Sequence, residues 1–165
     1  ISLFYEPVRK ELLRQHNWAF ATRFAKLSPV EIPEDEYPLS DGIIYAYPAN
    51  ALFVTRLFVA HVKSRIHFKE FFSASTGKKC IACPFPEVTA EYTQDITDTE
   101  LFSPDFAQTF SLALAANLAM TLTGDVNLAQ LAMQRYVVAL DAARLSNKQE
   151  GEEKAPMKSD LWEVR

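Results

Sequence analysis

The spacing of the apolar residues changes once along this chain, and that change restricts the fold more than any other feature of the sequence. Between residues 20 and 95, short segments rich in aromatic and β-branched residues are separated by turn residues, which is typical of β-strands. After Ser103-Pro104 the apolar residues recur with the helical period instead. The sequence therefore predicts an α+β fold with a small antiparallel β region in the middle of the chain.

The helical part is predicted to be a bundle made of an N-terminal helix and a C-terminal antiparallel hairpin. Ser103 and Pro104 mark a helix start, a capping side chain followed by proline at the first helical position. Gly124 is expected to end that helix and Asp125 to cap the next one. The expected helices cover residues 3–16, 104–123 and 125–147. One side of the last helix is expected to hold Ala129, Met133, Tyr136, Val137 and Leu140.

The β region is expected to consist of short strands joined by tight turns. The candidate strands are residues 20–27, 43–47, 53–62, 67–74, 79–83 and 88–95. Residues 48–51 supply a turn between the second and third of these, and Ser75-Thr76-Gly77 has the composition of a hairpin turn.

The composition changes again after residue 147. Residues 1–147 are predicted to form one domain, and residues 148–165 a flexible polar linker that ends in an apolar hook. The hook consists of Leu161, Trp162, Val164 and Arg165. Tryptophan and arginine are favoured anchors of protein interfaces, which indicates a hook onto another molecule. A clip onto its own domain is the alternative.

Charge and hydropathy exclude several classes of function. The formal net charge is −4, and no arginine-rich or lysine-rich tract occurs, whereas strong nucleic-acid binders need positive charge. The stretch from Phe110 to Leu122 is interrupted by polar residues and is not expected to cross a membrane. We expect a soluble protein made in the cytoplasm.

Catalytic motifs are missing from the sequence. There is no G-x-S-x-G, no phosphate-binding glycine loop and no H-E-x-x-H. Asp95, Asp98 and Glu100 have the oxygen donors of metal ligands, but this segment is better suited to capping a helix start. We expect no enzymatic activity, no metal and no cofactor.

Two cysteines form a single C-x-x-C, Cys80 and Cys83. This spacing occurs in redox pairs and in half of a zinc site. In a strand, however, residues three apart point to opposite faces, and no second pair of ligands is evident. We expect two small buried side chains in a sheet.

Three blocks of the sequence carry a family resemblance. Residues 8–21 are VRKELLRQHNWAFA, residues 45–52 are YAYPANAL and residues 91–98 are EYTQDITD. In this order they resemble the blocks R-x-E-L-L-R-x-H-P-W-N-F-A, Y-A-Y-x-L-P-A-D-x-L and Y-x-x-x-I-T-D-P of the head-to-tail adaptor (tail tubular protein A) family of short-tailed bacteriophages. Asn17, Ala19 and Asn50 depart from the family pattern, and the second block lacks the residue before its proline. Residues 101–122 and the tryptophan-containing end of the chain are similar to the family as well.

The resemblance implies a structural protein of the virion, located in the tail or neck and assembled in the host cytoplasm. The family forms a ring, commonly dodecameric, that joins the portal protein to the next tail (nozzle) protein. Its axial channel lets double-stranded DNA pass without sequence-specific binding, and no membrane is involved. In that setting Trp18 packs where the first helix meets the first strand. The alternatives are another connector, such as a stopper or tail-completion protein, and a small regulatory or enzymatic domain outside the virion.

The residues suggest where such a ring would make its contacts. We expect the hook to bind the portal or a neighbouring subunit. An acidic loop of Glu31, Glu34, Asp35 and Glu36 is expected to face the channel or the distal face, where negative charge disfavours adhesion of DNA. In the helical hairpin, apolar residues outside the main stripe either pack in the core or contact a neighbouring subunit: Leu112, Ala116, Met120, Leu128, Leu131 and Val138.

Overall fold

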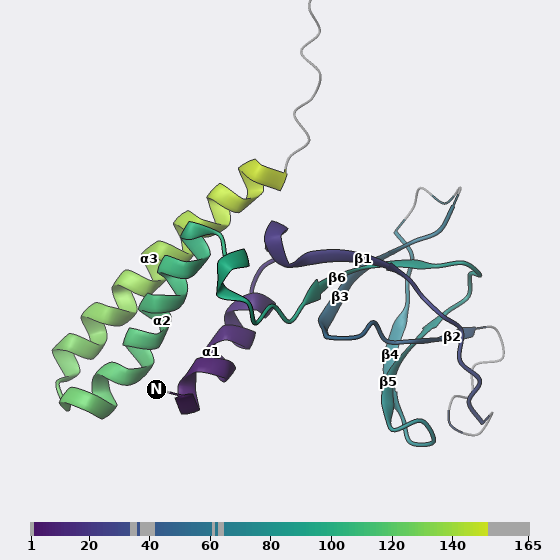
Figure 1. Cartoon of the computed structure of the whole chain (residues 1–165), viewed down its shortest axis with the longest axis horizontal. Coiled ribbons are helices and arrows are strands. Elements are labelled where there is room, and N and C mark those ends of the chain that lie inside the picture. Colours follow the sequence, from purple (N-terminus) through teal and green to yellow (C-terminus); the bar gives the residue numbers. More distant parts are fainter. Residues whose placement is uncertain (1, 34–35, 37–41, 61, 63–64, 152–165) are drawn as a thin grey trace, which may run out of the picture.

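The computed structural model describes residues 2–33, 36, 42–60, 62 and 65–151 (Figure 1). The described chain is of mixed α+β type, as predicted, with the helices at one end and the strands at the other. The helices are α1 (Ser2–Arg14), α2 (Pro104–Thr123) and α3 (Val126–Gly151), and two 3₁₀ turns cover Ala19–Ala21 and Thr99–Leu101. The strands are β1 (Thr22–Lys26), β2 (Ile43–Ala46), β3 (Ala51–Phe58), β4 (Lys69–Ser73), β5 (Lys78–Cys83) and β6 (Thr89–Gln94).

The strands form two three-stranded antiparallel sheets. Their orders are β1-β6-β3 and β2-β5-β4. The predicted turn at Ser75-Thr76-Gly77 joins β4 to β5, and Gly77 has a φ of 64°, a left-handed conformation that glycine adopts without strain. Asn50, before β3, has a φ of 57°, and asparagine is one of the few other residues that tolerate this region.

The signals that predicted the boundaries of α2 act as expected. The Ser103 hydroxyl accepts a hydrogen bond from the Phe106 amide at 3.4 Å, and Pro104 opens the helix. Gly124 ends α2 with a φ of 65°. The Asp125 carboxylate then accepts from the Asn127 amide at 2.8 Å, which caps α3.

Two helix ends differ from the prediction. α1 stops at Arg14 rather than at residue 16, because the chain turns there to bring Trp18 into the core. α3 continues past residue 147 to Gly151, so the prediction of a linker from residue 148 is wrong for residues 148–151. The Asn147 and Arg144 side chains bond to residues 15–19, and these contacts hold the last turns of α3 against the domain.

Each half of the molecule has its own apolar core. The helical core surrounds Trp18 and Phe106, which are fully buried and meet edge to face with ring centroids 5.0 Å apart. The Trp18 indole N–H donates to the Leu12 carbonyl at 2.9 Å, so its burial leaves no polar group unpaired. The second core lies between the two sheets and includes Tyr45, Ile81 and Val88. The expectation that Trp18 packs at the junction of the first helix and the first strand is confirmed.

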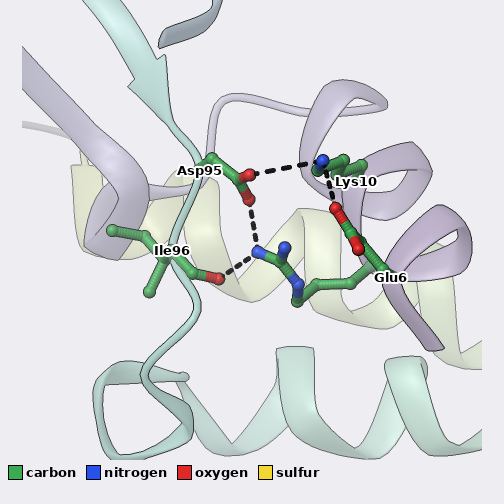
Figure 2. A network of polar contacts seen from close by, with 5 residues as sticks. Glu6, Lys10, Asp95 and Ile96 are labelled. Atoms are coloured by element: carbon green, nitrogen blue, oxygen red, sulfur yellow. Dashed lines mark hydrogen bonds and ion pairs between the residues drawn. The ribbon is translucent and has the colours of Figure 1, made fainter. Parts of the chain in front are cut away.

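A buried arginine links the two halves (Figure 2). The Arg9 side chain on α1 is 3% exposed, and one guanidinium nitrogen donates to both the Asp95 carboxylate and the Ile96 carbonyl. Lys10 approaches the other carboxylate oxygen of Asp95 at 3.7 Å and also pairs with Glu6. Because Asp95 follows β6 directly, this network fixes α1 to the segment that leaves the sheet for α2.

Candidate functional site

The hairpin formed by α2 and α3 is the candidate site, because most of the large apolar side chains that are exposed among the described residues lie on it. The two helices run antiparallel and side by side, away from the strands (Figure 1). The Thr109 hydroxyl of α2 donates to the Ala139 carbonyl of α3 at 3.3 Å, which marks how closely the helices approach. α1 covers one side of α2, so much of the rest of the hairpin faces solvent.

The half of the hairpin that includes its tip is almost free of charge. From Phe106 to Gln134 the sequence has one charged residue, Asp125. Large apolar side chains lie exposed there, with Leu122 and Val138 each 71% exposed. The complete set on the hairpin is Met120, Leu122, Val126, Leu128, Leu131, Met133, Val137, Val138 and Leu145. Exposed apolar surfaces of this kind are typical of sites for protein or membrane contacts.

The apolar residues extend over two sides of the hairpin, and a shallow pocket lined by Met133, Val137 and Val138 lies between these sides. The outer face has a groove between α2 and α3, lined by Leu112, Leu131 and Val138, with Asp105 and Arg135 among its polar residues. On α3, Leu131, Val138 and Leu145 are spaced by seven residues and therefore form one stripe along the helix.

The opposite face borders α1. Its groove lies between all three helices and is lined by Val8 and Glu11 of α1, Ala116 of α2, and Met133 and Tyr136 of α3. Met133 is 52% exposed and Val137 is 45% exposed, so this predicted apolar side of the helix is only partly covered. On that side Leu140 is buried, whereas Tyr136 packs only partly against the helical core.

α2 also meets the criterion of length and composition for a membrane-spanning helix. The helix has 20 residues, and its most apolar 18-residue stretch has a mean hydropathy of 1.2, with 28% of that stretch buried. Length and composition alone do not test the expectation that residues 110–122 stay out of a membrane, and it stays a prediction. Core helices of soluble proteins pass the same test, and the inward face of α2 carries Phe106, Phe110 and Ala113 in the helical core.

The acidic loop is described only in part. Glu31 is exposed, as expected, whereas Glu34 and Asp35 lie outside the described residues. Glu36 is bound to the β4–β5 turn, where its carboxylate accepts from the Ser73 hydroxyl at 2.8 Å and from the Ser75 amide at 2.7 Å. The hydrogen bond from Ser73, with those from Ser75, lowers the pKa of Glu36. Glu36 thus holds the loop to the second sheet, and a position facing a channel stays a prediction.

The hook lies outside the described residues: Leu161, Trp162, Val164 and Arg165. Its predicted binding to the portal or to a neighbouring subunit therefore stays a prediction. The structure does describe the end of α3, from which the linker to the hook (called the tether below) leaves the domain. Asn147, near this end, binds the residues that precede β1. The Asn147 side chain accepts from the Ala19 amide at 2.8 Å and donates to the Asn17 carbonyl at 2.8 Å.

The cysteines and the acidic residues near residue 98 have structural positions. Cys80 and Cys83 are free and buried in β5, and burial raises the pKa of the Cys83 thiol, which disfavours the reactive thiolate. Asp98 accepts from the Glu100 amide at 3.0 Å and so caps a 3₁₀ turn, as expected. Within the described part of the chain, no three His, Cys, Asp or Glu side chains gather as metal ligands would.

A histidine at the end of α1 makes the start of the tether sensitive to pH. His16 Nε2 lies 2.9 Å from the Asn147 amide nitrogen, so the neutral ring accepts a hydrogen bond there. Burial, and then the positive charges of Arg144 and Lys148, lower the pKa of His16 below its usual 6.5. Protonation would remove this acceptor and add a third positive charge to the cluster.

The stability of the protein is therefore expected to fall on acidification through this histidine. Since the pKa of His16 is lower in the folded state, the unfolded chain takes up the proton first. The contribution to stability is complete above pH 6.5 and is lost progressively as the pH falls through the folded pKa. Urea unfolding of wild type and His16→Gln between pH 7.5 and 5 measures this effect. The wild type should lose more stability than the variant, and parallel curves would contradict the prediction.

The sequence did not reveal the full extent of the hairpin surface. Leu122, Val126 and Leu145 were not predicted as exposed, although the seven-residue spacing from Leu131 to Leu145 was a readable signal. The exposed pair Phe24 and Phe58 on the first sheet was also missed. Alternation along a strand separates its two faces, but it does not say which face a second layer covers.

No protein-family model matches this chain, and no curated protein matches it either.

Proposed function

We propose that this chain is a structural subunit of a virus particle, a ring-forming adaptor that joins the portal to the tail and leaves a channel for DNA. The observation that carries the proposal is the exposed apolar surface of the α2–α3 hairpin, which has few charged residues. A subunit with such a surface is poorly suited to remain alone in water, because covering apolar area is the main force in protein association.

The arrangement of that surface favours a ring over a simple dimer. A symmetric dimer needs one self-complementary face, whereas a ring needs two different faces that fit each other head to tail. The hairpin offers two: the outer groove with Leu131 and Val138, and the α1-side groove with Ala116 and Met133. We propose that the outer face of one subunit packs against the α1-side face of the next.

The identity of the assembly comes from the sequence blocks that resemble the phage adaptor family. Two residues of these blocks have structural roles in the fold. Trp18 is buried at the helix–strand junction, and Asp98 caps the turn before α2. The formal charge of −4 per subunit would be repeated around a ring. A channel with that charge disfavours adhesion of DNA, and Glu31 with the rest of the acidic loop would contribute to it.

Sedimentation with the portal protein of the same genome tests the proposal. Full-length protein is expected to co-sediment with the portal, and images of the pellet should show rings seated on it. A chain that ends at Pro156 lacks the hook, and loss of rings with this chain would place docking in the hook. Rings that persist would place docking in the folded body. Absence of co-sedimentation by both chains would overturn the adaptor function, and a ring of another size or position would favour a stopper or tail-completion protein.

The length and hydropathy of α2 favour one competing function, insertion of the hairpin into a membrane. Flotation with vesicles of neutral and anionic lipid separates the two functions. The adaptor is expected to stay at the bottom of the gradient, and co-flotation that Leu122→Asp abolishes would support the membrane function instead, since Leu122 is 71% exposed near the hairpin tip.

A further inference from the structure

The sheet β1-β6-β3 carries an exposed aromatic patch that the proposed ring contacts do not use. Phe24 on β1 is 63% exposed and Phe58 on β3 is 41% exposed, and their ring centroids lie 6.1 Å apart. The Arg56 guanidinium lies over the Phe58 ring, 5.8 Å from its centroid. Phe24 and Arg56 face each other across Glu91 of the central strand, so they belong to the same face of the sheet. We call Phe24, Phe58 and Arg56 the aromatic patch.

The aromatic patch has the composition of a binding site rather than of a core. Neither phenylalanine belongs to the two buried clusters. Charged side chains surround the rings, with Arg56 57% exposed, Lys26 67% exposed and Glu87 78% exposed. Aromatic side chains with an arginine at their side are typical of residues that anchor protein partners.

We propose that the aromatic patch binds the hook of the same chain, with Trp162 packed against Phe24 and Phe58. The hook supplies what the patch lacks, a large apolar side chain with acidic neighbours. Asp160 and Glu163 flank the Leu161-Trp162 pair. They can share the exposed cations Arg56 and Lys26, which pair with Glu91 at 3.3 Å and with Glu87 at 3.4 Å in the free face. Arg165 can in turn approach Glu87, which is more exposed than the other acid of this face, Glu91.

The position of the tether brings the hook within reach of the patch. Asn147 is bound to Ala19, and the helix rises about 6 Å from there to Gly151. Phe24 lies five residues beyond Ala19, at most about 17 Å along the chain. The eleven residues from Gly151 to Trp162 span up to about 36 Å when extended. The path adds up to about 23 Å, plus the Asn147 side chain and its 2.8 Å hydrogen bond to Ala19. This total stays below the reach of about 36 Å of the linker, so no second subunit is needed.

This inference concerns the free subunit and does not depend on the ring. If the adaptor function also holds, the same contact would shield Trp162 from other partners until the portal or a neighbouring subunit competes for it. A failure of the contact would leave the ring proposal untouched, and a failure of the ring would leave the contact in place.

Tryptophan fluorescence of the full-length protein tests the contact. The chain has two tryptophans, and Trp18 is fully buried, so subtracting the signal of Trp162→Phe isolates Trp162. Trp162 is expected to be shielded from acrylamide in the wild type. Phe24→Ser should lower the ratio of docked to free hook about 30-fold, the loss expected for a hot-spot residue, and expose Trp162 to the quencher.

Phe72→Ser is the matched control, since Phe72 is 68% exposed but lies on β4 in the other sheet. This variant should leave Trp162 shielded. Phe58→Ser should expose Trp162 as Phe24→Ser does. To show that each variant is folded, the same substitution is made together with Trp162→Phe, and Trp18 should stay shielded from the quencher. Equal quenching of Trp162 in the wild type and in Phe24→Ser would overturn the inference. The inference would also be overturned if the shielding of Trp162 and the sedimentation coefficient both increased with protein concentration. The hook would then bind a second copy of the chain.

Discussion

Val138→Glu is expected to abolish ring assembly on the portal while the subunit stays folded. Val138 is 71% exposed on the outer face of the hairpin, so the free subunit accommodates the carboxylate in water. Substitutions at such surface positions usually change stability by less than about 0.5 kcal/mol. In the proposed contact the same carboxylate would be buried in a groove that is largely apolar and has one cationic side chain, Arg135. That burial costs about 3 kcal/mol or more, which weakens each subunit contact at least about 100-fold.

Leu101→Glu provides the matched control for this prediction. Leu101 is 50% exposed in the 3₁₀ turn before α2, outside both grooves of the hairpin. Rings on the portal, counted in electron micrographs, should form with Leu101→Glu and not with Val138→Glu. Thermal unfolding of the free subunits should be the same within a few degrees for both variants. Rings of normal abundance with Val138→Glu would show that the outer face is not a subunit contact.

A mixture of two variants distinguishes a head-to-tail contact from a symmetric one. Met133→Glu changes the α1-side face, where Met133 is 52% exposed, and leaves the outer face intact. In a head-to-tail ring, Val138→Glu and Met133→Glu subunits can join once through their unchanged faces and then extend no further. Chemical cross-linking of the mixture should therefore yield dimers and no larger species. If the outer face pairs only with itself, Met133→Glu alone would assemble normally.

The sequence predicts the hairpin well because its boundaries depend on neighbours in the chain. A hydroxyl at residue 103, a proline after it and a left-handed glycine at 124 determine where α2 begins and ends, whatever the rest of the fold does. The end of α3 is different. Its last turns are held by Asn147, whose partners Asn17 and Ala19 are far away in sequence, so local polarity alone indicated a linker there.

The candidate site was harder to predict than the fold for a related reason. Periodicity placed Met133 and Val137 on an apolar stripe, but α1 is too short to cover them, and only the packed arrangement shows this. The sequence identified Glu36 by its charge and not by its bonds to Ser73 and Ser75, which require the β4–β5 turn to be formed. Composition thus finds residues suited to contacts, whereas tertiary packing decides which of them are left exposed.

Arg9→Met should destabilise the subunit by about 2–4 kcal/mol, a large part of the 5–15 kcal/mol that typically holds a domain together. The Arg9 side chain is 3% exposed and satisfies both the Asp95 carboxylate and the Ile96 carbonyl. Methionine fills much of the same space but leaves both acceptors without their donor. The cost lies below that of a fully buried broken pair, because Asp95 is 21% exposed and can gain water. Urea unfolding at pH 7 measures the difference.

Lys10→Met separates the role of the buried network from that of charge alone. Lys10 also faces Asp95, at 3.7 Å, but its side chain is 39% exposed, and such pairs contribute about 1 kcal/mol or less. If Arg9 acts by holding α1 to the segment after β6, Arg9→Met should loosen the helical layer against the sheets, and hydrogen exchange should increase in both α1 and residues 95–98. Lys10→Met should leave that exchange unchanged. Equal increases in hydrogen exchange in the two variants would mean that Asp95 needs only a nearby positive charge. The packing of Trp18 against Phe106 would then have to hold the hairpin in place relative to the sheets.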